Sequence, residues 1–293
     1  MSGSRDAEKP YRRAYIEITN VCNLNCAFCP GTRRAPRFLS PEEFALLARA
    51  VKPHTDYVCL HLMGEPLLHP ALGRILEICG EEGLRANLTT NGTLLEDVKD
   101  ILLSAPALRK LSVSLHSFEA NGDGPPLGDY LSRVLPVVRR AREAGIICEL
   151  RLWNGGGARR LNGLVCRAVE REFGIPVGEP PDGVCDRKLA EKLHLVTAPA
   201  FDWPDMALPA GDGRVSCLGM RDHFGILADG TVVPCCLDSE GTIALGNAFE
   251  RPLGEILASP PRPSGCGRVF PARGRGGTLQ ALRLRAPLLT GGL

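Results

Sequence analysis

The chain has 293 residues, of which 44% are hydrophobic and 23% charged, with a formal net charge of +2. These values are typical of one large globular domain with a small addition. No apolar run reaches the roughly 20 residues that cross a bilayer, and the polar N-terminus lacks the apolar core of a secretory signal. We therefore expect a cytoplasmic protein with no membrane partner. Residues 256–293 carry six arginines and no acid, so the remainder is mildly acidic, which argues against nucleic-acid binding.

Strand and helix patterns alternate along most of the chain. We predict strands at 15–19, 57–62, 85–90, 110–115 and 146–153, with a weaker sixth at 193–197. Between them we predict helices at 41–51, 70–82, 94–104, 130–144 and 158–173. Connections rich in proline and glycine fill 174–192 and 198–214, and the second is interpreted as a linker. The alternation predicts an α/β fold in which a parallel sheet curls into a full or partial barrel.

Twelve cysteines are many for this length. Their irregular spacing, without an export signal, favours metal sites over disulfides. Four are predicted to be small buried hydrophobic residues: Cys59, Cys79, Cys148 and Cys166. Cys185 lies in a loop-like stretch and receives no assignment.

A cysteine triplet follows the first predicted strand. Cys22, Cys26 and Cys29 are separated by three and two residues, so one loop can bring three thiols to one site. Thiolates are the ligands of iron–sulfur clusters, and a four-iron cluster held by three cysteines keeps one iron open. The loop begins at the C-terminal end of a strand, where parallel α/β folds place their chemistry. A zinc fragment or a chance triplet is the alternative.

This spacing, with the aromatic Phe28 directly before the third cysteine, resembles the signature of the radical SAM enzymes. Gly64, Glu65 and Pro66 end the second predicted strand and resemble the family's Gly-Gly-Glu-Pro motif, with Met63 replacing the first glycine. In the family this motif binds the amino group of S-adenosylmethionine, for which a carboxylate is chemically suited. The resemblance implies a partial (β/α)6 TIM-like barrel, a 4Fe-4S cluster and S-adenosylmethionine as cofactors, and an electron donor such as flavodoxin or ferredoxin.

Further candidates lie at the ends of later strands. Residues 89–92 resemble the end of the family's third strand, and Ser114 is a candidate to contact the cofactor's ribose or carboxylate. His116 is interpreted either as a substrate-facing group or as a structural histidine. On the fifth strand Arg151 shares one face with Glu149. Arg151 is predicted to bind the cofactor carboxylate, and a pair with Glu149 or an outward face is the alternative.

The segment after the cysteine loop is basic and contains Arg33, Arg34 and Arg37. It is interpreted as a solvated loop. The alternative is that it forms a rim of the site and contacts an acidic substrate.

A third block runs from Cys217 to Cys236. Residues 224–227 and 231–233 flank a turn at 228–230 and predict a β-hairpin. Cys217, Gly230 and Cys235 resemble the opening of the SPASM or twitch extension, which implies a possible auxiliary iron–sulfur cluster with Cys236 beside it. Residues 245–247 and a predicted helix at 253–258 resemble the continuation of that extension. The alternatives are a hairpin flanked by buried thiols, or a zinc site.

The resemblance ends near Pro260. Only Cys266 follows, in a stretch rich in proline, glycine and arginine, whereas the family pattern requires further cysteines. We hypothesise that the tail is disordered, or out of frame relative to its relatives. Resequencing the coding DNA tests this, and an intact frame with a matching mass spectrum of the tail would contradict it.

We therefore expect a radical SAM core at 14–197, a linker and SPASM-like extension at 198–258, and a disordered or aberrant tail at 259–293. The resemblance implies reductive cleavage of S-adenosylmethionine and hydrogen abstraction from a substrate at the barrel mouth. A peptide or protein substrate is expected first, by analogy with relatives that carry the extension. A small-molecule substrate, or a non-catalytic zinc protein that uses the first three cysteines as ligands, is the alternative.

Overall fold

The computed structural model describes residues 9–121, 126–155, 160–181, 183–200, 203 and 218–259. Their strands form one open, ten-stranded sheet in the order β10-β9-β8-β1-β2-β3-β4-β5-β7-β6. Neighbours from β8 through β1–β5 to β7 are parallel, whereas β6, β9 and β10 pair antiparallel at the edges. The strands are β1 Arg13–Ile16, β2 Tyr57–Cys59, β3 Arg85–Thr90, β4 Leu108–Ser114, β5 Ile147–Gly155, β6 Cys185–Ala190, β7 Leu193–Pro199, β8 His223–Ile226, β9 Thr231–Val233 and β10 Gly246–Asn247.

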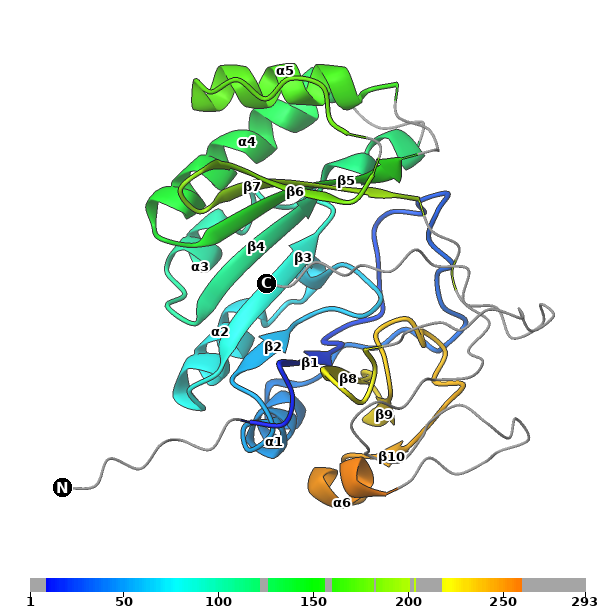
Figure 1. Ribbon diagram of the computed structural model, residues 1–293. Helices are drawn as coiled ribbons and strands as arrows, with labels where there is room; N and C mark the ends of the chain where they lie inside the picture. The colour runs from blue at the N-terminus through cyan, green and yellow to red at the C-terminus, as the bar shows by residue number, and fades with distance from the viewer. Residues whose placement is uncertain are drawn as a thin grey trace.

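Helices follow the strands and line one side of the curved sheet, from α1 near β1 to α5 near β5 (Figure 1). The α-helices are α1 Pro41–Val51, α2 Leu72–Glu81, α3 Lys99–Leu103, α4 Leu127–Glu143, α5 Asn162–Phe173 and α6 Leu253–Ala258. Short 3-10 helices are η1 Pro66–Leu68, η2 Leu115–Ser117 and η3 Glu119–Asn121. In the part of the chain described, every helix is too short or too polar to cross a membrane. The prediction of an α/β fold with a partial barrel is confirmed.

The helix α1 begins where the sequence predicts because its cap is complete. Ser40 Oγ accepts a hydrogen bond from Glu43 N at 3.1 Å, and the Glu43 carboxylate accepts one from Ser40 N at 2.9 Å. Pro41 supplies a preset backbone angle at the first helical position. Phe44 and Leu47 then bury the apolar face of the helix. The start of α1 at Pro41 therefore fixes the position at which the segment that follows the cysteine loop ends.

The apolar core lies between the sheet and its helices. The strands contribute alternate side chains and the helices contribute one stripe each, because one face of each element is turned to the other layer. Representative core residues are Ile16, Val58, Leu88, Val113, Leu150, Leu76 and Val138. The four cysteines predicted to be buried are buried: Cys59, Cys79, Cys148 and Cys166.

Apart from shifts of a few residues at the ends of other elements, two elements differ from the sequence prediction. Residues 185–190 form strand β6, where the sequence predicts a connection, and Cys185 lies on it. β6 is an edge strand whose residues are all half-buried or exposed, so it lacks the apolar run that marks inner strands. The predicted helix 94–104 is limited to α3, because residues 94–98 form turns.

The predicted hairpin extends the sheet beyond β1. β8 pairs with β1 in parallel register, with Arg13 opposite His223 and Ile16 opposite Ile226. The extension therefore shares a sheet with the core (Figure 1). Most of the predicted linker, Cys217 and the tail from residue 260 onward lie outside the described residues. The domain bounds 14–197 and 198–258 stay a prediction.

Candidate functional site

The cysteine loop leaves the fold at the end of β1 and returns at α1. Thr19 and Phe38 form an antiparallel bridge that closes the base of the loop. Cys22 is exposed, and Cys26 and Cys29 are half-buried. The backbone N–H of Cys29 donates to Cys26 O at 2.9 Å, which forms a tight turn. The thiols are therefore accessible at the ends of the parallel strands, where a cofactor can reach them.

Two asparagines hold this loop against the end of β3. Asn91 Nδ2 donates to Asn23 Oδ1 at 3.0 Å, and Asn23 Nδ2 donates to Thr93 Oγ1 at 2.8 Å. The hydroxyl of Tyr130, from α4, donates to Asn91 O at 2.7 Å. Gly92 has a φ of +81°, and a Cβ there would lie 2.9 Å from Tyr130 Oη. The turn at 89–92 therefore requires glycine and positions the cysteine loop.

Asn121 holds the loop from the turns after β4. Its Nδ2 lies 3.1 Å from Cys26 Sγ and 2.6 Å from Ser117 O. Its Oδ1 accepts a hydrogen bond from Asn25 N at 3.0 Å. An N–H directed at a ligand sulfur affects the reduction potential of a cluster. No sequence pattern marks Asn121, because the contact joins residues far apart in the chain.

Gly64 packs directly against the cysteine loop. Its φ is +76°, and a Cβ would lie 2.5 Å from Thr19 O and 2.8 Å from Val21 O. Because these atoms are backbone, they cannot move aside as the end of a flexible side chain can. The next residue, Glu65, donates its backbone N–H to Val21 O at 2.8 Å. The predicted motif therefore fixes where the cysteine loop starts.

The Glu65 carboxylate is buried and hydrogen-bonded. It accepts bonds from Thr90 Oγ1 at 2.7 Å, Asn91 N at 2.8 Å and Leu67 N at 3.0 Å. Burial raises its pKa to about 6, although these bonds oppose the shift. Glu65 thus joins the ends of β2 and β3. Its predicted contact with the amino group of S-adenosylmethionine stays a prediction.

A buried ion pair connects the base of the loop to the rest of the site. Arg34 donates to both carboxylate oxygens of Glu17 at 2.7 Å. Glu17 also accepts bonds from Met63 N and Ala228 N, both at 3.1 Å. Arg34 Nε donates to Ser239 O at 2.8 Å. Arg34 therefore has a structural role, which neither interpretation of the basic segment anticipates.

Ser114, His116 and Phe28 lie beside the loop. Ser114 ends β4 and is half-buried. His116 Nδ1 lies 3.1 Å from Arg151 O, and its ring packs against Phe28 with centroids 4.9 Å apart. Burial lowers the pKa of His116 to about 4, so the ring is neutral at pH 7. These contacts favour the structural interpretation of His116, while the Phe28 side chain stays partly accessible.

Arg151 belongs to a charged network on the inner face of the sheet. Glu149 accepts bonds from Arg151 Nη2 at 2.8 Å, Lys110 Nζ at 2.7 Å and Ser112 Oγ at 2.7 Å. Burial alone would raise the pKa of Glu149, but Arg151 and Lys110 outweigh it and lower the pKa to about 2. Arg151 also lies 4.6 Å from the ring of Trp153. The Glu149–Arg151 pair weighed as an alternative is therefore present, and it is turned inward.

Two buried polar atoms next to this network lack a hydrogen-bond partner among the described residues. They are His61 Nδ1 and Trp153 Nε1. His61 lies near the network because its Nε2 is 3.2 Å from Thr89 Oγ1, to which Arg151 Nη1 donates at 3.3 Å. Since buried polar atoms are nearly always paired, these two atoms are candidates to hydrogen-bond a ligand.

The hairpin carries a second group of metal-binding side chains. A ring nitrogen of His223 and the Sγ atoms of Cys235 and Cys236 lie within 4.8 Å of one another. Burial and Arg13 lower the pKa of His223 to about 4, so its ring is neutral at pH 7. The other predicted ligand, Cys217, lies outside the described residues. Sequence reasoning missed His223, although continuing the hairpin register places it opposite Cys235.

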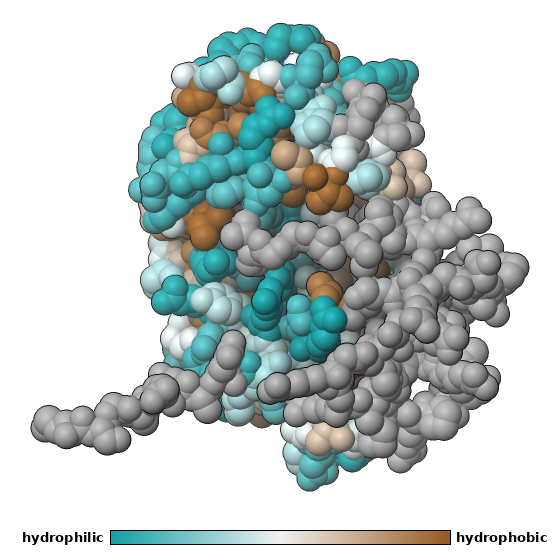
Figure 2. Space-filling model, in the orientation of Figure 1, coloured by the Kyte–Doolittle hydropathy of each residue, from teal (hydrophilic) through white to brown (hydrophobic). Residues whose placement is uncertain are grey.

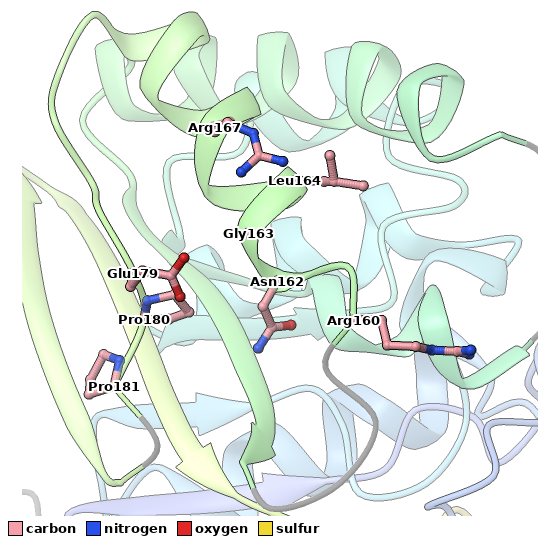
Figure 3. A pocket seen from close by; sticks show the side chains of 8 residues that line it. All are labelled: Arg160, Asn162, Gly163, Leu164, Arg167, Glu179, Pro180 and Pro181. Atoms are coloured by element: carbon pink, nitrogen blue, oxygen red, sulfur yellow. The ribbon is translucent and has the colours of Figure 1, made fainter.

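The surface also has a pocket away from the cysteine loop. It has a volume of about 570 Å³ and lies between α5 and residues 179–181 (Figure 3). Arg160, Arg167 and Glu179 are among its lining residues. None of the predicted site residues lines it, so the pocket is distinct from the cysteine site. The coloured part of the face shown in Figure 2 is largely hydrophilic, with hydrophobic patches toward the end that carries α5.

Comparison with known families agrees with this geometry. Residues 16–158 match the model of the radical SAM superfamily, and residues 217–265 match SPASM, an iron–sulfur cluster-binding domain. All the predicted ligand cysteines lie in these two segments.

Curated relatives match about half of the chain. An uncharacterized protein of Methanocaldococcus jannaschii is 32% identical over 46% of this chain and 46% of its own length. A protein of Saccharolobus islandicus named "Probable GTP 3',8-cyclase" is 31% identical over 47% of this chain and 46% of its own length. The match therefore spans about half the length of these relatives.

Solved structures share the fold over most of the chain. SuiB of Streptococcus suis bound to S-adenosylmethionine has a TM-score of 0.61 and 17% identity, over 86% of this chain and 67% of that chain. The structure of anSMEcpe with bound AdoMet has a TM-score of 0.57 and 14% identity, over 85% and 78%. Thiolate donors suit iron–sulfur clusters, and the accessible loop leaves room for a cofactor. This chain belongs to the radical SAM superfamily of enzymes, with a SPASM domain, and the predicted cofactors, a 4Fe-4S cluster and S-adenosylmethionine, are those of the superfamily.

Proposed function

We propose that this protein cleaves S-adenosylmethionine reductively at a 4Fe-4S cluster held by Cys22, Cys26 and Cys29, and that it modifies a peptide or protein. The observation that carries the proposal is the fixed position of the cysteine loop. Residues at the ends of β2, β3 and β4 each contact it, namely Gly64, Asn91 and Asn121. A loop with three thiols leaves one iron of such a cluster without a protein ligand.

The chemistry of the cofactors requires little of the protein beyond placement. When held by Cys22, Cys26 and Cys29, the cluster would supply the electron for reductive cleavage of a carbon–sulfur bond of S-adenosylmethionine, and the cleaved cofactor would provide the hydrogen-abstracting group. The electron comes from a small donor such as flavodoxin or ferredoxin.

The residues of the chain bind and orient. Glu65 places a buried carboxylate next to the loop, where an ammonium group of the cofactor would find a counter-charge. Ser114 ends β4 and pairs in register with Arg151 on β5, and these two residues orient the ribose or carboxylate. The unpaired atoms of His61 and Trp153 lie next to Arg151 and are available to hydrogen-bond a ligand.

A peptide substrate is supported by two similar structures. SuiB has been solved bound to the precursor peptide SuiA, with a TM-score of 0.52 to this chain. The structure of anSMEcpe contains AdoMet and a Cp18Cys peptide, with a TM-score of 0.56. A small-molecule substrate is the second candidate, because the matching Saccharolobus proteins are named as GTP cyclases.

Anaerobic reconstitution with iron and sulfide tests the reaction. With a one-electron reductant and S-adenosylmethionine, the wild type should release equal amounts of methionine and 5′-deoxyadenosine. Cys26→Ala should lower nucleoside release by roughly 100-fold or more, because a cluster ligand is lost. Cys185→Ala, a half-buried cysteine on β6, is the matched control and should behave as wild type. A colourless zinc protein without nucleoside release would support the non-catalytic alternative.

The substrate class is tested by hydrogen transfer. Deuterated candidate peptides and nucleotides are incubated with the reconstituted enzyme, and deuterium in 5′-deoxyadenosine is measured by mass spectrometry. Transfer from a peptide supports the proposal. Transfer from nucleotides alone would assign the enzyme to the small-molecule class.

A further inference from the structure

We propose that His223, Cys235 and Cys236 bind a single divalent metal ion of the zinc or ferrous class, at a site separate from the cysteine loop. Their ligand atoms lie within 4.8 Å of one another. Among the described residues, no other group of three potential metal ligands has its ligand atoms this close together. One imidazole nitrogen and two thiolates form a donor set that is common for zinc and also suits iron.

The spacing favours one ion over a cluster. In a tetrahedral site with bonds of about 2.0–2.3 Å, the ligand atoms lie about 3.5–3.8 Å apart, so small side-chain movements complete the site. In a four-iron cluster each thiolate binds a different iron at a separate corner, which keeps the sulfurs farther apart. Cys22, Cys26 and Cys29, all in the described part of the chain, do not converge within the same limit. The ligand atoms of the hairpin group are therefore spaced closely enough for one ion, whereas the three thiols of the cysteine loop are spaced more widely, as a four-iron cluster requires.

The position of His223 is set by the sheet. His223 begins β8 and lies opposite Arg13 on β1, and its ring packs edge-on against Tyr15 with centroids 5.4 Å apart. Farther along β8, Gly225 pairs with Val233, and a Cβ on Gly225 would lie 2.9 Å from Leu62 Cδ1. This close packing keeps the two hairpin strands in register, so the histidine and the two cysteines meet without rearrangement of the backbone.

One ring nitrogen of His223 is available to bind a metal. Its Nε2 is buried and has no hydrogen-bond partner in the described part of the chain. Leaving such an atom unpaired costs free energy, which a metal–nitrogen bond would recover. The site stands independently of the proposed cleavage of S-adenosylmethionine, because it shares no residue with the cysteine loop.

Cobalt(II) is the probe that reports both the number and the type of ligands. The full chain is prepared with Cys22, Cys26 and Cys29 replaced by alanine, so that the loop no longer competes. We expect one cobalt per chain, with the intense visible bands of a tetrahedral ion and thiolate charge-transfer bands. His223→Ala in this background should weaken cobalt binding by roughly 10-fold or more. Unchanged binding would overturn the proposal.

A second variant keeps the test decisive if His223→Ala does not fold. His223→Cys replaces nitrogen by sulfur, so the charge-transfer intensity per cobalt should rise from that of two thiolates toward that of three. An unchanged spectrum would overturn the assignment of residue 223 as a ligand.

The native ion is identified by elemental analysis of the same triple-alanine chain, expressed with zinc or with iron. One zinc or one iron per chain, without acid-labile sulfide, supports the proposal for either ion. Four irons with four sulfides, retained in the His223→Ala variant, would show a cluster instead and overturn it.

Discussion

The two sulfur-bearing regions of the molecule are built differently. The cysteine loop takes its three thiols from one exposed segment, and that segment is held from outside by Asn91 and Asn121. The hairpin takes His223 from one strand and two cysteines from the end of the other, in a position fixed by the sheet. An exposed loop leaves room for a cofactor to approach a metal bound there. Ligands fixed by a sheet instead suit a structural metal, which needs no contact with a substrate or cofactor.

The two regions are nevertheless connected through Glu17. Its carboxylate accepts a bond from Met63 N, beside the Gly64 turn, and from Ala228 N, in the hairpin turn. Arg34, in the returning part of the cysteine loop, completes the connection. Changes in this ion pair should therefore affect both regions, while changes elsewhere should affect only one.

Glu17→Gln should have the largest effect. It leaves Arg34 without its counter-charge in a largely buried position, which costs about 3–5 kcal/mol in the free energy of unfolding. Urea denaturation measures the loss, and metal content should fall at both regions. Glu81→Gln, in an exposed pair with Arg74, is the control and should change little. A Glu17→Gln variant as stable as the wild type would contradict the connection.

Gly64→Ala should come next and should act on the cysteine loop alone. The new Cβ would lie 2.5 Å from Thr19 O, and φ is +76°, so the backbone must shift. We expect a loss of about 3 kcal/mol in stability and poor incorporation of iron. Gly31→Ala is the matched control, because Gly31 has a φ of +62° but nothing within 4 Å. It should cost only about 1 kcal/mol. Equal losses in the two variants would show that the close contact is unimportant.

Glu65 should make stability depend on pH. Its folded pKa is about 6, above the ordinary value of 4.5, so its contribution is fully present below pH 4.5 and is lost as pH rises through 6. Over this interval the free energy of unfolding should fall by about 2 kcal/mol relative to a Glu65→Gln variant. Denaturation of both proteins from pH 4 to pH 7, without S-adenosylmethionine, measures the difference. A constant difference would contradict the buried carboxylate.

Asn121→Leu should have the smallest effect and should appear in the cluster's potential. Removing an N–H bond of about 1 kcal/mol to Cys26 Sγ should lower the one-electron midpoint potential by roughly 40 mV, because the bond favours the more negative, reduced cluster. A redox titration followed by electron paramagnetic resonance measures the shift. Asn87→Leu removes a similar contact to Cys59 Sγ, away from the loop, and is the control. Equal potentials in wild type and Asn121→Leu would exclude the tuning role.

Much of the fold could be predicted because its information is local. The capping residues Ser40 and Glu43 set the start of α1, and glycine-containing turns at Gly83 and Gly92 bound β3 on both sides. The cysteine spacing and the Gly64-Glu65 turn likewise lie within short segments that can be compared with a family. Edge strand β6 escaped prediction because it buries little and therefore has no apolar pattern.

The unpredicted parts of the site depend on contacts between distant segments. Glu17 belongs to an alternating strand pattern, and its partner Arg34 belongs to a basic segment, so neither residue indicates the other. Asn121 reaches Cys26 across almost a hundred positions. His223 is different, because its position opposite Cys235 follows from the register of a hairpin whose strands and turn are both marked in the sequence.

The central claim is that the cysteine loop holds a cluster with one iron open to S-adenosylmethionine. It is tested most directly by electron–nuclear double resonance on the reduced, reconstituted protein with S-adenosylmethionine labelled with nitrogen-15 at its amino group. We predict a hyperfine coupling between the cluster and the labelled nitrogen, which should disappear in Cys26→Ala and persist in Cys185→Ala. A reduced cluster with no coupling to bound S-adenosylmethionine would contradict the account.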